Sequence, residues 1–241
     1  MTTTGTAAFN LDLNDLIEEA FERCGHELRS GYDFRTARRS LNLLTIEWSN
    51  RGINLWTIEQ GQITMVTGQA TYDLPVDTID LLDQVIRTNA GSASNQTDIN
   101  INRISESTYS TIPNKLATGR PIQVWINRRS GATEPSGIKN PQINVWPTPN
   151  NPGDQYQFVY WRLRRIQDAG DGINTQDIPF RFLNAMIAGL AYYLSMKLPD
   201  MDPNRAMALK ADYEQQFDLA AQEDREKASI RFVPRNMFYA R

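Results

Sequence analysis

The residues that could support catalysis are few and poorly spaced for it. The chain has one cysteine, Cys24, and one histidine, His26, which lie two positions apart just after an apolar helical segment. A Cys-His or Ser-His-Asp mechanism needs that histidine beside a nucleophile and a third, orienting group. The spacing favours a helix terminus with a partly exposed imidazole over a catalytic pair. We therefore expect no catalytic residues.

Metal and phosphate chemistry also lack their usual patterns. One cysteine and one histidine cannot supply the ligands of a common zinc site, and neither GxxxxGK[ST] nor GxGxxG occurs. The connector with Asp168, Asp171 and Asp177 loosely resembles a calcium loop, without the spacing or terminal glutamate of an EF-hand. We expect no cofactor and no metal. A solvated connector is favoured at 168–177, and a bound cation there is the open alternative.

Aromatic and basic residues on predicted strands offer two further possibilities. Trp125, Trp146 and Trp161 fall on separate strand candidates, where aromatic side chains mostly pack the sheet but can also stack on a sugar or base. Arginines at strand ends could meet phosphate or a partner's carboxylates, and they are Arg128, Arg129, Arg162, Arg164 and Arg165. We favour sheet packing for the tryptophans, and partner contact or a solvated rim for the arginines.

Two competing functions rest on these residues. A carbohydrate-active enzyme would use the tryptophans with a carboxylate pair, but pairs such as Glu18–Glu19 and Glu223–Asp224 are predicted on solvated helix faces. A DNA-binding module would use the arginines, although the net charge of −3 argues against extensive nucleic-acid binding. Both are less favoured than a non-enzymatic structural protein.

Length and composition indicate an ordinary globular protein. The 241 residues are 40% hydrophobic and 22% charged, which is enough to form a core without disulfides or metals. A lone cysteine cannot form an internal disulfide. No stretch reaches the roughly 18 apolar residues that a membrane span needs, and the first residues do not resemble a signal peptide.

Helical periodicity is concentrated at the two ends of the chain. The strongest pattern begins at Asp33, a candidate N-cap, and ends at Gly52, where a positive φ is favoured. Its apolar residues recur at steps of three and four on one helix face, and they are Phe34, Ala37, Leu41, Leu44 and Trp48. A shorter helix is predicted over 11–24, capped by Asp12 or Asn10.

Two more helices are predicted near the C-terminus. The first covers 178–197 with Pro179 in its first turn, and the second begins with Asp202 as cap and Pro203 as a first-turn residue. Four apolar stripes are most simply buried by packing the helices together. The core residues predicted to be buried against one another are Leu41, Leu44, Trp48, Leu190 and Leu194.

The middle of the chain has the two-residue period of strands, separated by turns rich in Gly, Pro and Asn. Strands are predicted over 55–66, 70–74, 79–88, 98–102, 122–127, 142–146 and 155–165, with a short helix over 105–112 capped by Ser105. The predicted fold class is α+β. It comprises a four-helix bundle formed by the N- and C-terminal helix pairs, an inserted antiparallel β-sandwich or barrel, and an extended C-terminal arm.

The predicted domains follow this order. Residues 1–54 hold the N-terminal helices of the bundle, and 55–166 form the inserted β domain. Residues 167–228 hold the C-terminal helices of the bundle, and 229–241 form the extended arm. The four segments thus describe one bundle interrupted by a β insertion.

This order of elements resembles a known family. The segments ARRSLNLLTIEWSNRGINLWTIEQ and IPFRFLNAMIAGLAYYLSMKL flank the β insertion, and a charged helix and a tail follow. They resemble the head-to-tail adaptor proteins of short-tailed bacteriophages (podoviruses), the group of tail tubular protein A and related portal accessory factors. The large β insertion is the main departure. The resemblance implies a virion connector that forms a ring, expected to be a dodecamer, under the portal, extends the DNA channel and docks the tail.

The resemblance also implies the partners. They are the portal protein, a tail or nozzle protein, further copies of the chain, and genomic DNA that passes non-specifically during ejection, with no membrane. The location would be the head–tail junction of the virion, after assembly in the host cytoplasm. The alternative is a carbohydrate-binding or carbohydrate-cleaving tail protein.

The C-terminal arm is the predicted portal-binding segment, because the family's arm grips the portal. Arginine and aromatic residues, which most often anchor interfaces, alternate along it, and Pro234 forbids a continuous helix. The residues predicted to bind the portal are Ile230, Arg231, Phe232, Arg235, Phe238, Tyr239 and Arg241.

Overall fold

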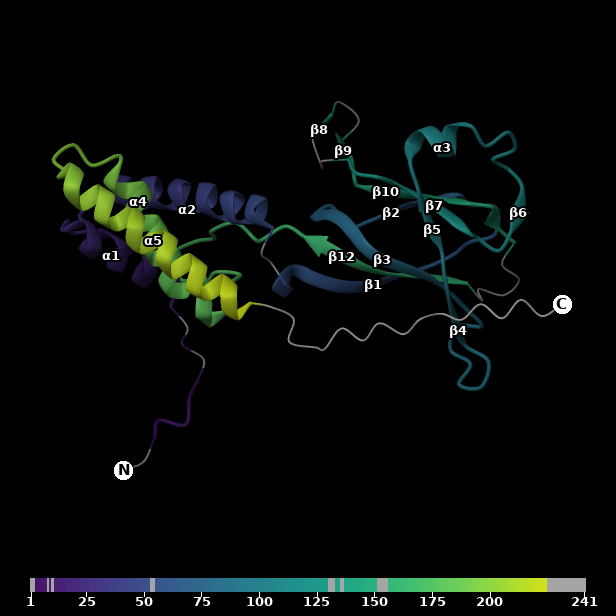
Figure 1. The fold of residues 1–241 in the computed structure, drawn as a ribbon, viewed down its shortest axis with the longest axis horizontal. Helices are drawn as coiled ribbons and strands as arrows, with labels where there is room; N and C mark the ends of the chain where they lie inside the picture. Colours follow the sequence, from purple (N-terminus) through teal and green to yellow (C-terminus); the bar gives the residue numbers. More distant parts are fainter. Residues whose placement is uncertain are drawn as a thin grey trace. The chain divides into compact units, whose positions relative to one another are not determined.

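The computed structural model describes residues 3–7, 9, 11–52, 55–129, 133–134, 137–150 and 156–224. The predicted portal-binding arm, 229–241, lies outside these residues. The chain divides into two compact units, residues 1–44 with 180–241 and residues 45–179. Figure 1 shows mainly helices in the first unit and strands in the second. The predicted α+β class is confirmed. None of the described helices is both long enough and apolar enough to cross a membrane.

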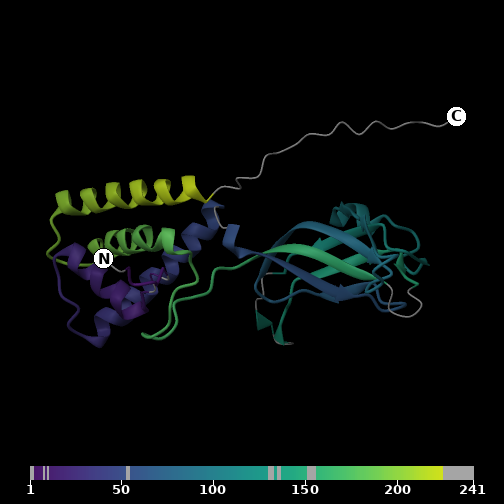
Figure 2. The same cartoon turned by 90° about the horizontal axis from the view of Figure 1, so that it is seen from below.

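The helical unit is organised around one central helix. Its helices are α1 (Leu13–Cys24), α2 (Gly31–Arg51, of which 31–44 belong to this unit), α4 (Leu183–Ser195) and α5 (Pro203–Glu223), with a 3-10 turn, η2 (Phe180–Phe182), before α4. Helix α4 is buried almost all round. Figure 2 shows α5 along one side of α4 and α1 along the other. Apolar side chains on nearly every face of α4 therefore have a neighbouring helix to pack against.

Helix α2 also packs on α4 and its C-terminal extension. The Lys197 Nζ donates to the Ser40 Oγ at 2.7 Å. A Cβ placed on Gly189 would lie 3.0 Å from both methyl carbons of Leu44 and 2.9 Å from the Tyr213 ring of α5. The absence of a side chain at Gly189 thus lets α2 and α5 approach α4 closely. All five predicted core residues are at most 1% exposed, so their burial is confirmed.

The ends of α1 and α2 show which helix caps the residue types alone predict correctly. Asp12 caps α1 by accepting from the Asp15 N–H at 2.9 Å, and Gly52 has the expected positive φ of 74°. The prediction of Asp33 as the cap of α2 is wrong. Ser30 precedes the helix, accepts from the Asp33 N–H at 3.2 Å and donates to the Asp33 carboxylate at 2.8 Å. Asp33 is the reciprocal partner inside the first turn.

For the C-terminal helices, the predicted cap of α5 is confirmed, but the predicted start of α4 is not. Asp202 accepts from the Asn204 N–H at 3.0 Å and Pro203 is the first residue of α5, both as predicted. Helix α4, however, begins at Leu183 rather than at 178, because the 3-10 turn η2 comes between Pro179 and the helix. Pro179 therefore precedes the regular helix instead of lying in its first turn.

The β unit contains two four-stranded sheets. The first is fully antiparallel, in the order β1 (Ile58–Thr64), β12 (Gln157–Arg164), β3 (Thr78–Thr88) and β4 (Thr97–Asn100). The second has the order β2 (Thr71–Asp73), β10 (Gln142–Trp146), β7 (Gln123–Asn127) and β5 (Asn102–Ile104), and its last pair is parallel. Neither four-stranded sheet closes on itself, so the barrel alternative does not describe these strands.

Smaller elements complete the β unit. Strands β6 (Thr118–Gly119) and β11 (Thr148–Pro149) pair in parallel, and β8 (Thr133–Glu134) pairs with β9 (Gly137–Ile138). A 3-10 turn, η1 (Leu55–Thr57), precedes β1, so the first strand starts later than predicted. Helix α3 (Glu106–Ser110) is capped by Ser105, as predicted, through the Thr108 N–H.

The two four-stranded sheets bury one common apolar cluster. It takes Leu81, Ile86, Phe158 and Tyr160 from the first sheet and Tyr72, Val124, Ile126, Ile143 and Val145 from the second, together with Met65, Leu74 and Ile101 from the connecting segments. Ile101 lies where the chain passes from β4 in one sheet to β5 in the other. Ile122, the first residue of the strand predicted over 122–127, precedes β7 and is 43% exposed. Burial of this shared cluster gives the β unit its own core.

Candidate functional site

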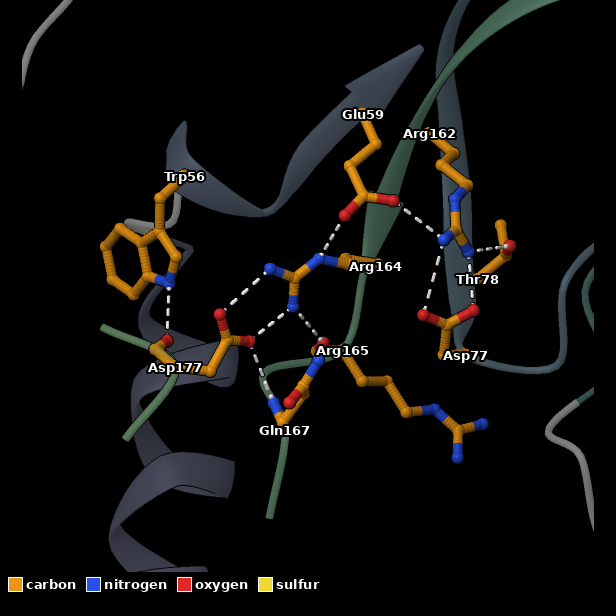
Figure 3. Close-up of polar contacts among 9 residues, drawn as sticks. All are labelled: Trp56, Glu59, Asp77, Thr78, Arg162, Arg164, Arg165, Gln167 and Asp177. Carbon is orange, nitrogen blue, oxygen red and sulfur yellow. Dashed lines mark hydrogen bonds and ion pairs between the residues drawn. The ribbon is translucent and has the colours of Figure 1, made fainter. Parts of the chain in front are cut away.

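A network of charged side chains lies on one face of β12, where Arg162 and Arg164 are two residues apart (Figure 3). Residues two apart on a strand share a face, and each arginine side chain is only 11% exposed. The pairing of β12 with β3 changes register between Trp161 and Arg162 and again between Leu163 and Arg164. Such irregularities turn side chains locally. The local backbone therefore places two guanidinium groups close together.

Glu59 of β1 connects the two arginines. It is the direct cross-strand partner of Arg162, and its Oε2 accepts from the Arg162 Nη2 at 2.8 Å. Its Oε1 accepts from the Arg164 Nε at 2.6 Å. Asp77 completes the other end, where its Oδ1 accepts from the Arg162 Nη1 at 2.5 Å. The pairing of β1 with β12 thus explains why the carboxylate of Glu59 bridges the two arginines.

Asp177 brings the connector after β12 into the same network. Both of its carboxylate oxygens accept from Arg164, with the Oδ1–Nη2 distance being 2.9 Å, and Oδ2 also accepts from the Gln167 N–H at 3.1 Å. Its main-chain carbonyl accepts from the Trp56 Nε1 at 3.0 Å. The segments before β1 and after β12 are therefore tied to each other and to the sheet (Figure 3). A bidentate arginine–carboxylate pair is among the strongest of such contacts.

The contacts favour the charged forms of Arg164 and Asp77. The hydrogen bond that Arg164 donates to Asp177 raises the pKa of Arg164 more than burial lowers it. Burial acts to raise the pKa of Asp77, but the hydrogen bond and charge of Arg162 outweigh it, so the pKa of Asp77 is lowered. Two guanidinium groups face three carboxylates. Arg162 and Arg164 are consequently neutralised within the chain, and the expectation that they meet phosphate or a partner's carboxylates is wrong.

Asp77 gives the network a testable pH dependence. A carboxyl group whose pKa is lowered by folding stabilises the native state above its ordinary pKa of 3.8, and this stability is lost as the pH falls through the lowered value. We expect Asp77→Asn to lower the denaturant midpoint at pH 7, and the difference from the wild type to shrink below about pH 4. Midpoints measured at pH 7, 5 and 3 test this.

The matched control is Asp83→Asn, which changes an exposed carboxylate on β3, the strand that begins directly after Asp77. It should leave the midpoint near that of the wild type at each pH, since it removes no member of the network. Equal midpoints for Asp77→Asn and Asp83→Asn at pH 7 would show that the Arg162–Asp77 contact adds no stability.

The remaining candidates for chemistry have structural roles. Cys24 is buried, its Sγ contacts the Ala191 carbonyl at 3.2 Å, and burial raises the pKa of the thiol to about 11. A thiol in that state is a poor nucleophile. His26 follows Gly25, the left-handed residue that ends α1, as the helix-terminus interpretation predicted. Asp224 was predicted on a solvated face but is buried and paired with Arg181.

One of the three acidic residues of the connector, Asp177, belongs to the network. Asp177 faces Arg164, and among the described residues no cluster of three or more His, Cys, Asp or Glu is arranged to hold a metal ion. The tryptophans do not form a common platform either. Trp125 stacks on Tyr109 at 5.3 Å between ring centroids, and the Trp146 Nε1 donates to the Asn114 carbonyl at 2.9 Å. Trp161 belongs to the other sheet.

Sequence reasoning singled out the arginines of the network and, as a possible cation ligand, Asp177, but it did not pair them. Glu59 becomes a partner through strand register, and Asp77 and Asp177 through tertiary placement. No local pattern in the sequence marks any of the three as an arginine partner. These features define an α+β protein with a helical unit and a β unit, in which a polar network among the described residues ties the ends of the β unit together.

The family of this α+β protein follows from a comparison with family models. The model for the SU10 adaptor protein family matches residues 11–236. Because the match covers nearly the whole sequence, the chain belongs to the SU10 adaptor protein family. Membership supports a structural adaptor role in a phage virion, which agrees with the predicted phage adaptor at this level. A search among curated proteins found no match.

Proposed function

We propose that this adaptor forms a ring, expected to be a dodecamer, under the portal of a short-tailed phage, as adaptors of the tail tubular protein A type do. In this role it extends the DNA channel, lets the genome pass without sequence-specific binding, and docks a tail or nozzle protein. Assembly takes place in the host cytoplasm, and the final location is the head–tail junction. The family match over 11–236 is the observation that supports this proposal most directly.

The two units suit separate tasks in such an assembly. We assign ring packing to the helical unit, acting as a four-helix bundle, because amphipathic helices offer faces for neighbouring subunits. We assign the tail-facing or ring-supporting role to the β unit, acting as a sandwich with its own core. The carbohydrate alternative gains no support, since Trp125 and Trp146 are held by contacts within the chain.

The C-terminal arm is assigned to the portal. Its first part falls inside the range of the family match, and its arginine and aromatic residues suit an interface anchor. Its aromatic side chains would enter pockets between portal subunits while its arginines pair with acidic groups. The residues assigned to this contact are Ile230, Arg231, Phe232, Arg235, Phe238, Tyr239 and Arg241.

Deleting residues 230–241 tests the assignment of the arm. The truncated protein should keep the unfolding midpoint of the full chain, because the deletion removes none of the core residues in the part of the chain that the structure describes. It should fail to attach to particles that carry the portal protein of the same phage, and those particles should lose DNA. Occupancy is measured by gel densitometry of purified particles, and retained DNA by nuclease protection.

Two double variants separate the contributions of aromatic and arginine side chains within the arm. Phe232→Ala with Phe238→Ala removes aromatic anchors, whereas Arg231→Lys with Arg235→Lys keeps the charge and serves as the milder control. We expect a larger loss of occupancy from the first pair, since aromatic anchors bury more surface. Normal occupancy of the truncated protein on portal-bearing particles would refute the role of the arm.

A further inference from the structure

The outward face of α2 has an unusual composition for a solvated helix. Its exposed residues follow one another at steps of 3, 4, 4, 3 and 4, and they are Tyr32, Arg35, Arg39, Leu43, Ile46 and Asn50. Leu43 and Ile46 are 54% and 57% exposed, although they lie on the same helix as the buried Leu44. We call this face the α2 stripe. Its N-terminal half is basic and its C-terminal half is aliphatic.

The outward face of α5 shows the same spacing in the opposite direction. Steps of 4, 3, 4, 4 and 3 connect exposed residues on one side of the helix, which are Asn204, Ala208, Ala211, Gln215, Leu219 and Gln222. We call this face the α5 stripe. Small alanines occupy its N-terminal half, beside Met207, which is 71% exposed. Glu214 and Asp218 give its C-terminal half a negative charge.

The two stripes match when the helices are antiparallel. Leu43 and Ile46 then face Ala211 and Ala208, whose small side chains let two helices approach closely. In the same register, Arg39 faces Gln215 next to Glu214, and Arg35 faces Leu219 next to Asp218. Tyr32 and Asn50 meet Gln222 and Asn204 at the two ends. One register therefore aligns aliphatic residues with small ones and places each of the two arginines opposite a neutral residue that adjoins a carboxylate.

The stripes of one chain cannot meet each other. The buried faces of α2 and α5 both rest on α4, since Leu44 and Tyr213 contact Gly189 from their own helices. Their outward faces consequently point away from this shared helix. The complementary surface for each stripe must come from another molecule, and a second copy of the chain carries it.

A hollow beside the α2 stripe supports an acidic partner. It has a volume of about 580 Å³ and is lined by Tyr32, Asp33, Arg39, Leu43 and Lys197, among others. Arg39 and Lys197 both line this hollow, and burial together with the charge of Arg39 lowers the pKa of Lys197. Carboxylates brought by a neighbouring α5 would offset that repulsion.

We propose that the α2 stripe of one copy docks antiparallel onto the α5 stripe of the next copy, forming the head-to-tail contact between subunits. This proposal rests on the proposed ring and goes further by naming the two surfaces and their register. Because the two surfaces differ, each copy offers one free stripe of each kind after docking. Repetition of such a contact closes a ring when the rotation permits it.

Two charge variants of the full-length chain test the contact. The α2 variant carries Arg35→Glu with Arg39→Glu, and the α5 variant carries Gln215→Arg with Asp218→Arg. Each variant alone places like charges across every contact, and we expect its assembly constant to fall at least about tenfold. An equal mixture should restore assembly, because alternating copies place opposite charges at every contact.

The measurement is sedimentation velocity with light scattering, with and without the portal protein of the same phage. The control is Glu18→Arg with Glu22→Arg, which changes charge on an exposed face of α1 and should assemble like the wild type. Unfolding midpoints verify that each variant folds. Folded variants that assemble normally alone, or that fail to assemble when mixed, would overturn the proposed contact.

Covalent trapping tests the register directly. Leu43→Cys with Ala211→Cys should give a ladder of disulfide-linked multimers on oxidation, since these positions face each other across the contact. Leu43→Cys with Gln222→Cys places the second thiol at the far end of the stripe and should give no ladder. The buried Cys24 does not compete for oxidation. An unaltered wild-type ring with no ladder refutes only this contact, whereas a wild type that forms no ring even with portal refutes the proposed function.

Discussion

Leu44→Ala should lower the free energy of unfolding by roughly 2–5 kcal/mol, the range for large-to-small changes at buried aliphatic sites. Leu44 is fully buried, and its methyl carbons lie against Gly189 of the central helix α4. Because Gly189 has no side chain that could move into the space, the cavity should stay largely open. Urea denaturation followed by circular dichroism gives the value.

The adjacent residue provides a matched control. Leu43→Ala makes the same chemical change one position along α2, where the side chain is 54% exposed. At protein concentrations too low for assembly, it should cost less than about 1 kcal/mol, as surface changes do. If Leu44→Ala and Leu43→Ala had the same midpoint, the packing of α2 on α4 would not be as described.

The second large effect is expected from Arg164→Met, which should destabilise the chain by roughly 3 kcal/mol, near the lower end for breaking a buried ion pair. The side chain of Asp177 is only 19% exposed and would keep its charge without its main partner, whereas Glu59 is 44% exposed and can rehydrate. Arg164→Lys should recover part of the loss, since lysine keeps the charge but not the two-pronged geometry.

Arg103→Met is the control for Arg164→Met. Arg103 pairs with Asp80 at 2.8 Å, but its side chain is 40% exposed, and such surface pairs contribute up to about 1 kcal/mol. Chemical denaturation of the three variants in parallel ranks the contacts. Equal losses for Arg164→Met and Arg103→Met would mean that the network is no more stabilising than an ordinary surface ion pair.

The helices could be predicted because their signals are local. The apolar period placed Leu41, Leu44 and Trp48 on one buried face, and the caps at Asp12 and Asp202 were identified from residue type alone. Ser30 and Asp33 show the limit of this reasoning. Both are capping residues, and their reciprocal hydrogen bonds decide the boundary in three dimensions.

The strands could be located in sequence, but their partners could not. The predicted strand over 98–102 lies mostly in β4, which pairs with the preceding strand β3, whereas the parallel pairing of β5 with β7 was not foreseen. Pairing across long loops depends on the shared core, which no short window contains. The charged network escaped prediction for the same reason, since Glu59 reaches Arg162 only through strand register.

The hydrogen bond between Trp56 and Asp177 has a consequence for how this protein can evolve. The two residues are 121 positions apart, yet they fasten the points where the chain enters and leaves the β unit. Because its two ends are already joined, the β unit can gain or lose residues, or be replaced, with little change in the distance between those ends. We therefore expect sequence changes in the β unit to alter its surface while leaving the fold of the helical unit unchanged.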